Sequence, residues 1–446
     1  MNHSHRVLAS LFTLISSLSP LAAQASTGNL ATTYGLLPSD ISSAQAFSLF
    51  NTQSSAAYYN PASLASSDHG ELTLGLLHAS PSLTATSNGG DNPPVRSGDV
   101  LSNTNTESLL LGMKTNLTSL TKFKKPVYVG LIAGVESHGT EMLAFDSTTS
   151  KEGQFMQYGQ KPLFIAVSGG MEAIPGLNLG LGLRVTLHAS ATMNLETDLG
   201  GNTSNEELSV SAEPVMIPLF GITADLDTLL CDKKTDCWAD GLSTAISIRG
   251  SSNTQTTVES TAVIPGTIPE PGLPLNVTAL DAYQPIIVST GAQYRFNSKI
   301  DFAATLEYQN WSSLTEELKS DTIYDQADLS FNDIIIPRLG AKYAYNKDLN
   351  LITGFSYDMS PLDDGTSDNV NLFDNDRMVF AAGVNYFMRD TKWLAFPLRL
   401  DAAYQYHHLL ERDFTLTASD APVSPYESVT TGGSVHVFSM SVSMNF

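Results

Sequence analysis

Residues 435–446, at the carboxyl end of the chain, read V-H-V-F-S-M-S-V-S-M-N-F. From Phe438 onward every second residue is large and apolar, and serine or asparagine fills the positions between. A period of two is typical of a β-strand whose two faces meet different surroundings. This stretch therefore predicts a strand with one apolar and one polar face, and the fold depends on whether the rest of the chain repeats the pattern.

The same alternation recurs from Glu71 to the end of the chain, in about 14 segments of roughly ten residues. Clear examples lie at 72–76, 109–113, 127–135, 177–187, 300–309 and 398–407. Short turns at 175–176, 297–298 and 346–348 alternate with long connections such as 189–214, 251–284 and 408–433. An even number of strands joined in this way is typical of a transmembrane antiparallel β-barrel. We therefore predict an all-β fold, with the barrel over residues 68–446.

Residues 1–25 have the features of a secretory signal peptide. A weakly basic start with Arg6 precedes a mostly apolar run from Val7 to Leu21, and Ala23-Gln24-Ala25 forms a cleavage site of the small-x-small type. The run is too short for a membrane helix, and no other stretch approaches the ~18 apolar residues that one needs. The sequence thus predicts an exported chain that is cleaved before Ser26.

Residues 26–67 differ from the alternating segments, because they are rich in Ala, Ser, Tyr and Asn and show little alternation. Pro61 cannot donate to a strand ladder and restrains Asn60, so a turn is expected there. Two interpretations remain open for this segment. It forms either an irregular N-terminal arm or a plug folded inside the barrel.

The amino-acid composition indicates which partners and cofactors to expect. The chain carries 45 Asp and Glu against 23 Lys and Arg, a balance that argues against nucleic-acid binding. The two cysteines, Cys231 and Cys237, lie in a polar segment of an exported chain, which predicts a local disulfide. A metal site would need further ligands close by, and none is evident. We expect neither a metal nor a cofactor.

The alternation assigns several charged residues to the inside of the barrel. They are Arg184, His188, Asp301, Glu307, Arg338, Lys342, Arg399, Asp401 and His407. Pairing across a polar interior accounts for all of them. A second interpretation remains for Arg184 and Lys342, since a basic side chain suits the head group of an anionic ligand.

The connection at 251–284 is unusual for a loop. It reads T-A-V-I-P-G-T-I-P-E-P-G-L-P-L in its middle, with aliphatic residues between prolines and glycines. Contiguous apolar surface usually marks a binding site, although packing on the barrel rim is an equal alternative. The aliphatic residues are Val263, Ile264, Ile268, Leu273 and Leu275.

Four stretches together resemble the FadL family of outer-membrane transporters for hydrophobic compounds. The chain also ends on Phe446, as the terminal strands of outer-membrane barrels do. The four stretches are Asn60-Pro61-Ala62, similar to the NPA of the family's N-terminal hatch; 302–314, with a Trp-Ser pair; 336–340 followed by 354–361; and Phe373-Asp374-Asn375-Asp376-Arg377 leading into 382–386. They occur in family order across most of the mature chain.

The resemblance implies a barrel of 14 strands in the bacterial outer membrane, with residues 26–67 as a hatch in its lumen. It further implies passive uptake: loops 189–214 and 251–284 capture the substrate, an interior site holds it, and it leaves sideways at a kink in the third strand. Glycines and polar residues make a kink least costly in free energy near Gly134, Ser137, His138 and Gly139. Long-chain fatty acids, alkanes and aromatic hydrocarbons are the expected substrates, outer-membrane lipid the surroundings, and a monomer the expected state.

Other functions are weighed against uptake. An outer-membrane hydrolase would need an activated nucleophile, but no G-x-S-x-G motif occurs, so no enzymatic activity is expected. A general porin gives no reason for a hatch-like arm or an apolar loop. A porin and a surface adhesin nevertheless remain the alternatives.

Overall fold

The computed structural model describes residues 30–90, 98–100, 105–118, 125–136, 154–155, 163–197, 203–231, 237–264, 268–319, 330–363, 372–389, 394–416 and 427–446. The expected signal peptide at 1–25 lies outside these residues. Within them, no helix is long and apolar enough to cross a membrane.

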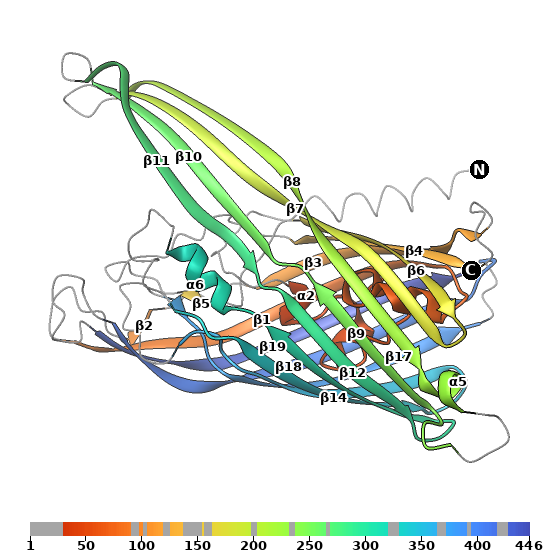
Figure 1. Cartoon of the computed structure of the whole chain (residues 1–446). Coiled ribbons are helices and arrows are strands. Elements are labelled where there is room, and N and C mark those ends of the chain that lie inside the picture. The colour runs from red at the N-terminus through yellow and green to blue at the C-terminus, as the bar shows by residue number, and fades with distance from the viewer. Residues whose placement is uncertain are drawn as a thin grey trace, which may run out of the picture.

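The described chain forms a sheet of 17 strands, and all but β2, β10 and β11 close into an antiparallel barrel of 14 strands (Figure 1). The barrel strands are β1 (Glu71–Gly89), β3 (Thr106–Asn116), β4 (Val127–Glu136), β6 (Leu163–Ile174), β7 (Leu177–Thr197), β8 (Thr203–Asp225), β9 (Leu242–Arg249), β12 (Ile287–Arg295), β13 (Ile300–Gln309), β14 (Ile334–Ala344), β15 (Leu349–Asp358), β17 (Arg377–Met388), β18 (Leu398–Leu416) and β19 (Glu427–Asn445). The barrel closes between its first and last strands, where Glu71 pairs with Asn445. The predicted fold class and strand number are confirmed.

The terminal stretch that predicted a two-faced strand lies in β19. Phe438, Met440 and Val442 are 50%, 65% and 47% exposed on the outside, whereas Ser439, Ser441 and Ser443 are buried. Neighbouring strands continue this outer apolar belt. Its members on three other strands are Leu72, Leu74, Leu76, Leu109, Leu111, Leu181 and Leu183. Such a band is the surface that a barrel presents to lipid.

Residues 30–66 lie inside the barrel as a set of short helices, drawn red to orange in Figure 1. They are α2 (Leu30–Thr33), α3 (Pro38–Ile41), α4 (Ala56–Tyr59) and the 3₁₀ helix η1 (Pro61–Ser66). Nearly every residue from 31 to 64 is buried or half-buried. Small residues with Ser hydroxyls suit such a compact segment, because most of its hydrogen bonds are made locally. We refer to residues 30–66 as the inner segment.

The connection predicted as a loop at 251–284 is a β-hairpin of β10 (Ser252–Ile264) and β11 (Ile268–Gln284), so that prediction was wrong. β10 also pairs in parallel with the outer part of β7, which itself pairs with β8 as far as Thr203. The predicted loop at 189–214 is therefore largely strand as well. Figure 1 shows these four strands leaving the barrel together, and we call their projecting part the extension.

The segment 251–284 was predicted as a loop because of its prolines. β11 contains Pro269, Pro271 and Pro274, and β8 contains Pro214, whereas β7 and β10 between them contain none. The strand pairings place β8 and β11 at the two sides of the extension. Proline is tolerated in an edge strand because its missing N–H faces away from the ladder, and it discourages pairing with another chain.

The remaining elements lie at the two ends of the barrel. The short turns, both chain ends of the barrel and α5 (Leu226–Leu230) share one end, which we call the short-turn end. At the other, long-loop end lie β2 (Gly98–Asp99), β5 (Gln154–Phe155), α6 (Ser312–Leu318) and β16 (Leu372–Phe373) (Figure 1). Cys231 and Cys237, beside α5, are joined by a disulfide with Cα atoms 5.6 Å apart.

Candidate functional site: the barrel interior

Asn60, Pro61 and Ala62 anchor the inner segment to the barrel wall. The Asn60 side-chain oxygen accepts a hydrogen bond from the Ala62 amide at 3.2 Å and so caps η1, whose first turn Pro61 fits without losing a bond. The same side chain donates to Thr223 Oγ1 of β8 at 2.9 Å and to the Leu49 carbonyl at 2.8 Å. The motif thus ties a helix start, a wall strand and the middle of the inner segment together.

Glycines on the inner faces of the wall strands make room for this segment. A Cβ added at Gly180 would overlap the backbone of Pro61 and Ala62, and one at Gly354 would overlap the backbone of Ser43. Other wall glycines whose added Cβ would meet inner-segment atoms closer than 3.4 Å are Gly112, Gly130, Gly170, Gly221, Gly291, Gly340 and Gly383. The wall is therefore shaped around residues 30–66 on most of its strands.

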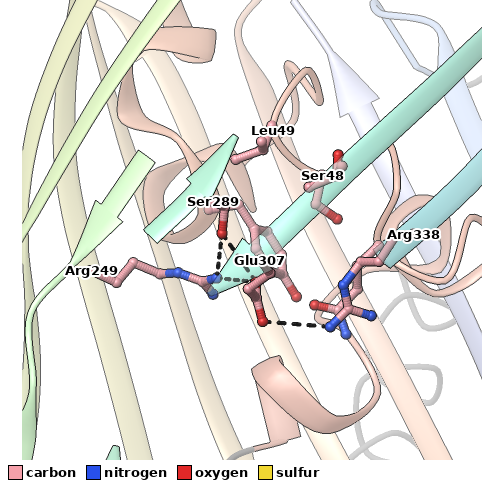
Figure 2. Close-up of a pocket in the computed structure, with 9 residues that line it drawn as sticks. Ser48, Leu49, Arg249, Ser289, Glu307 and Arg338 are labelled. Carbon is pink, nitrogen blue, oxygen red and sulfur yellow. Dashed lines mark hydrogen bonds and ion pairs between the residues drawn. The ribbon is translucent and has the colours of Figure 1, made fainter. Parts of the chain in front are cut away.

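Buried charges hold a turn of the inner segment from one side (Figure 2). Glu307 accepts from Arg249 and from Ser289 Oγ, the latter at 3.1 Å, and lies 3.5 Å from an Arg338 nitrogen. Arg338 in turn donates to the Ala44 carbonyl at 3.2 Å. A cavity of about 10 Å³ remains beside this cluster, scarcely room for one water. Such a space is too small for an aqueous path.

The turn at Ala44 and Gln45, which these wall contacts hold, has an unfavourable backbone conformation. Ala44 and Gln45 both have positive φ, at 47° and 65°, which costs non-glycine residues roughly 1 kcal/mol each. Thr305 Oγ1 donates to the next carbonyl, that of Ala46, at 2.9 Å. Contacts from the wall thus offset the local strain, and the fixed turn is a product of the tertiary structure.

Toward the long-loop end the polarity of the wall reverses. On β1, the outward residues Ser82, Thr84 and Thr86 are exposed and polar, while the inward Leu83 and Ala85 are 5% and 0% exposed. On β19, Val435 and Val437 are completely buried on the inside. One part of the barrel is apolar outside and polar inside, and the other part is polar outside and apolar inside.

The reversed part encloses a continuous apolar interior. Its buried members from the strands, α6 and the loops are Leu77, Ala79, Leu83, Ala85, Leu314, Leu318, Phe331, Ile334, Ile336, Leu362, Leu372, Phe373, Phe414, Val429, Val435 and Val437. Tyr34, Leu36 and Leu37 of the inner segment join the same cluster. Trp311 lies beside α6, 5.8 Å from the ring of Tyr283. We call this region the upper interior, and it suits an apolar ligand.

The opposite end of the lumen is polar. A cavity of about 330 Å³ lies at the short-turn end, beneath Phe47 and Phe50 of the inner segment. Charged residues line it, among them Arg295, Asp301 and Lys342. An apolar molecule entering this cavity would displace water from charged groups, which is unfavourable.

The charged residues predicted to face inward are inside wherever their side chains are described; His188 is not among them. Lys342 lies 3.6 Å from Asp301 at the short-turn end. Arg184, completely buried, hydrogen-bonds to Gln284 and lies with its guanidinium carbon 5.9 Å from the Tyr58 ring centre. Lys342 thus has a carboxylate partner and Arg184 a neutral amide partner, and Arg184 also lies near Tyr58, a member of the apolar cluster. Among the described residues no group of three or more His, Cys, Asp or Glu could hold a metal ion.

The third barrel strand, β4, carries Gly134, one of the four residues predicted to form a kink. Through Gly134 it pairs with β3 and β6 without a register shift. Ser137, His138 and Gly139 lie outside the described residues. β4 ends at Glu136, whereas β1 continues ten residues past its last pair with β3 and β7 continues to Thr197.

The extension has two chemically different faces, because paired residues share a face. Register places Leu273, Leu275 and Val277 of β11, Val258 and Ala262 of β10, Ala191, Met193 and Leu195 of β7, and Leu208 and Val210 of β8 on one face. Ser260 and Glu206 are its polar members. Thr, Ser, Asn and Glu dominate the other face. Of the predicted capture residues, Leu273 and Leu275 share the apolar face, Ile264 pairs with Ile268 near the tip, and Val263 pairs with Glu196.

Comparison with known proteins decides the family. The chain is 42% identical over 449 residues to alkane uptake protein A of Marinobacter nauticus, a match that covers 99% of this chain and 97% of that protein. The chain belongs to the OMPP1/FadL/TodX family of outer membrane transport proteins. The model of this family matches residues 250–446.

Solved structures of FadL-type proteins share the fold. A FadL homologue of Pseudomonas aeruginosa superposes with a TM-score of 0.56 at 14% identity, covering 96% of this chain and 99% of that one. A TodX monoaromatic hydrocarbon channel with a deltaS2 mutation gives 0.51 at 15% identity, covering 93% and 99%. The predicted family and the outer-membrane location are confirmed. The short-turn end is accordingly periplasmic and the long-loop end extracellular.

The sequence reasoning missed the upper interior, although a signal was present. In β19 the apolar positions change phase between Val437 and Phe438, and in β1 between Leu76 and Leu77. Two adjacent apolar residues in an alternating strand mark the level at which the apolar side passes from outside to inside. The run Ile334-Ile335-Ile336 in β14 marks the same level: Ile335 is 50% exposed, and its two neighbours are buried.

Proposed function

We propose that this FadL-family protein takes up hydrophobic molecules, alkanes among them, and passes them sideways into the outer membrane. The observation that carries the proposal is the reversed polarity of the wall. A part of the barrel that is polar outside and apolar inside, and that lies above the lipid belt, offers an apolar molecule surroundings out of water. Transfer is favoured by about 25 cal/mol per Å² of apolar surface removed from water.

Residues 26–67 act as a hatch in this proposal. The described part, 30–66, is buried against the wall, fits wall glycines and leaves a cavity of only about 10 Å³ at the buried charge cluster. These contacts favour a plugged transporter over an open porin. A surface adhesin would give no reason for an apolar interior.

The extension is the proposed capture surface. Its apolar face includes Leu273 and Leu275, and its edges carry prolines that discourage strand pairing with neighbouring chains. An apolar face held out into water at the cell surface binds hydrophobic molecules by contact area and needs no specific hydrogen bond. The aliphatic residues at 263–275 thus act as part of a sheet face, where the sequence had suggested a loop.

Uncharged hydrocarbons fit the upper interior better than carboxylates. The buried Asp374 adds a negative group there, and Arg412 already donates to Ser360 Oγ at 3.0 Å and to three backbone carbonyls. A fatty acid would need a cation to pair with its carboxylate, whereas the Arg412 guanidinium is already engaged. The name of the Marinobacter relative, alkane uptake protein A, agrees with this choice. Long-chain fatty acids are the second candidate class.

Exit occurs through the wall in this proposal. The polar cavity of about 330 Å³ on the periplasmic side disfavours release into the periplasm. The exit in this proposal lies at β4, near Gly134 and the predicted kink at 137–139. Release into the bilayer keeps the apolar molecule out of water throughout its passage.

Substitutions at two neighbouring residues, Leu83 and Thr84, test whether uptake passes through the upper interior. Leu83→Asp places a carboxylate in the upper interior, and we expect radiolabelled hexadecane uptake by cells to fall at least about tenfold. Thr84→Asp on the outward face is the matched control and should leave uptake unchanged. Both variants must show the folded band in an unheated gel. Equal uptake by the two variants would refute an interior route.

A disulfide staple tests lateral exit separately. Leu111 of β3 pairs with Ala133 of β4, so a double cysteine variant at these positions can lock the two strands. We expect oxidation to slow uptake several-fold and a reductant to restore it. A staple between Leu339 and Phe355, paired residues of β14 and β15, should have no effect. Undiminished uptake with the first staple fully formed would remove this exit site but not the uptake function.

A further inference from the structure

Exposed aromatic side chains gather at the short-turn end of the barrel. They come from β12 to β19 and from the turns between these strands, and each is at least 40% exposed. We call them the aromatic girdle: Tyr294, Phe296, Phe302, Tyr343, Tyr345, Tyr386, Phe396 and Phe446. Aromatic rings of outer-membrane barrels lie at the level of the lipid head groups. Because this end is periplasmic, the girdle marks the head-group level of the inner leaflet.

The girdle has a gap on the other side of the barrel. Among the side chains that the structure describes on β3, β4 and β6 to β9, none is an exposed aromatic. The exposed large residues near the short-turn end of β6 and β7 are aliphatic, Ile174 and Leu179. Trp238 lies in the segment that joins β8 to β9, and it is 75% exposed. An exposed indole therefore lies on the side where the strands lack one.

The segment that carries Trp238 is fixed to the barrel end. It begins with α5, beside the ends of β8 and β9 (Figure 1). The Asp225 amide donates to the Gly176 carbonyl of the β6–β7 turn at 2.7 Å, and a Cβ added at Gly176 would lie 3.1 Å from Leu229 of α5. The disulfide of Cys231 and Cys237 then closes the segment next to Trp238. The indole is thus held by a helix packed on a turn and by a covalent link.

Strand register gives the level of Trp238 along the barrel. Leu242, at the start of β9, pairs with Tyr294 of the aromatic girdle. The Leu242 amide donates to the Ala239 carbonyl at 2.9 Å, and Ala239 is completely buried. This turn keeps Trp238 within a few residues of the row that contains Tyr294. Trp238 therefore lies close to the level of the girdle.

Polar groups limit how deep the segment can lie. Asp227 on α5 is half-buried and Asp240 is exposed, while Leu230 between them is 57% exposed. Carboxylates are costly in the hydrocarbon core, and an exposed leucine and indole are unfavourable in water. A segment with both kinds of group suits the interface, where an indole keeps its apolar ring in lipid and its N–H near water.

We propose that α5 and Trp238 anchor the β6–β9 side of the barrel in the head-group region of the inner leaflet. Continuity with the lipid belt selects lipid as the occupant: Leu181 and Leu179 on β7, Ile174 at its turn and Leu230 on α5 are all exposed. The anchor completes the aromatic girdle on the side that lacks it. It also fixes the depth of the neighbouring strand β4, a consequence for substrate exit that rests on the proposed function.

Quenching of tryptophan fluorescence by brominated phospholipid tests the anchor in the full mature protein. The chain has three tryptophans, Trp238, Trp311 and Trp393. Trp311→Phe with Trp393→Phe leaves Trp238 as the reporter in phosphatidylcholine vesicles. We expect bromine near the head group to quench it at least about twofold more than bromine near the end of the acyl chain, because an interfacial indole lies closer to the former.

The matched control keeps Trp311 as the reporter, through Trp238→Phe with Trp393→Phe. Trp311 is 5% exposed and lies in the apolar cluster of the upper interior, so neither brominated lipid should quench it. A folded band in an unheated gel is required of each variant. If the first variant fails this requirement, the difference between the parent protein and Trp238→Phe gives the same quantity, since that substitution changes an exposed side chain.

Two results would overturn the proposal. Escape of Trp238 from both brominated lipids, with quenching by acrylamide, would place the indole in water, as at a surface for a periplasmic protein. Stronger quenching by bromine near the chain end would place it in the hydrocarbon. Neither measurement involves hydrocarbon uptake, so failure of the anchor and failure of the proposed function are distinguishable.

Discussion

The two parts of the barrel wall are built from the same strands with opposite polarity. In the membrane belt, apolar residues such as Met440 face lipid, and Ser441 faces a lumen filled by the inner segment. Above it, Thr84 faces water while Leu83 and Val437 face the upper interior. Apolar and polar residues alternate in both parts. Between the two parts the alternation shifts by one position, so the apolar side passes from outside to inside. The side of a barrel strand that is apolar therefore depends on where water lies.

The two interiors are also stabilised differently. The membrane-level interior is held by paired charges and hydrogen bonds, such as Arg249, Glu307 and Arg338, together with close contact at wall glycines. The upper interior is held by apolar packing, from Leu83 on β1 to Phe373 and Phe414. A polar interior with matched partners can be sealed against water, whereas an apolar one can admit an apolar molecule without leaving polar groups unpaired.

Removal of the inner segment should have the largest effect on the membrane-level interior. Deleting residues 30–66 leaves the polar lumen at membrane level without its filling, and a barrel of this size then encloses water. In planar bilayers we expect large stable channels from the deletion variant and none from the full mature chain. Closed channels after deletion would mean that side chains of the wall fill the lumen without help.

Loss of one buried carboxylate should have the next largest effect. Glu307→Gln leaves Arg249 and Arg338 buried without their shared partner, and breaking such an ion pair costs about 3–5 kcal/mol of unfolding free energy. Urea unfolding of the protein in detergent measures the loss. Glu316→Gln, which breaks an exposed contact of 2.7 Å with Lys319, is the control and should change nothing measurable. Similar stability of the two variants would show that the cluster does not hold the membrane-level interior.

A buried carboxyl at the extracellular end should make the stability of the protein depend on pH. Burial raises the pKa of Asp374 to about 6, above about 3.9 for an unfolded chain. The folded state therefore binds more protons between these values, and its stability falls as pH rises from about 4 to about 6. Asp374→Asn should make the protein more stable by about 3 kcal/mol at pH 7 and leave it nearly unchanged at pH 4. Unfolding curves of both proteins at the two pH values measure this, and a difference independent of pH would contradict it.

The barrel was predictable because its signal is local. Alternation in stretches such as 438–446 and 72–76 indicates which residues face lipid. Short turns such as Pro175-Gly176 indicate which strands are neighbours. The inward charges at Glu307, Arg338 and Arg399 followed from the same pattern. The Asn60-Pro61-Ala62 motif pointed to the inner segment through a family resemblance.

The extension was not predictable from the same signals. Three prolines in β11 indicate a loop by local rules, and only pairing with β10 on one side makes them acceptable. The parallel pairing of β10 with β7 joins residues far apart in the chain, such as Val258 and Ala191. No local pattern specifies that register, so the apolar face of the extension emerged only in three dimensions.

Local sequence patterns predicted about 14 alternating strands and an outer face that suits lipid, because each of these properties depends on residues close together in the chain. How the lumen is filled and where the apolar upper interior lies depend on contacts between distant parts of the chain. Gly354 accommodates Ser43 and Arg338 holds the Ala44 carbonyl across nearly 300 residues of sequence, because a closed barrel brings distant strands around one segment.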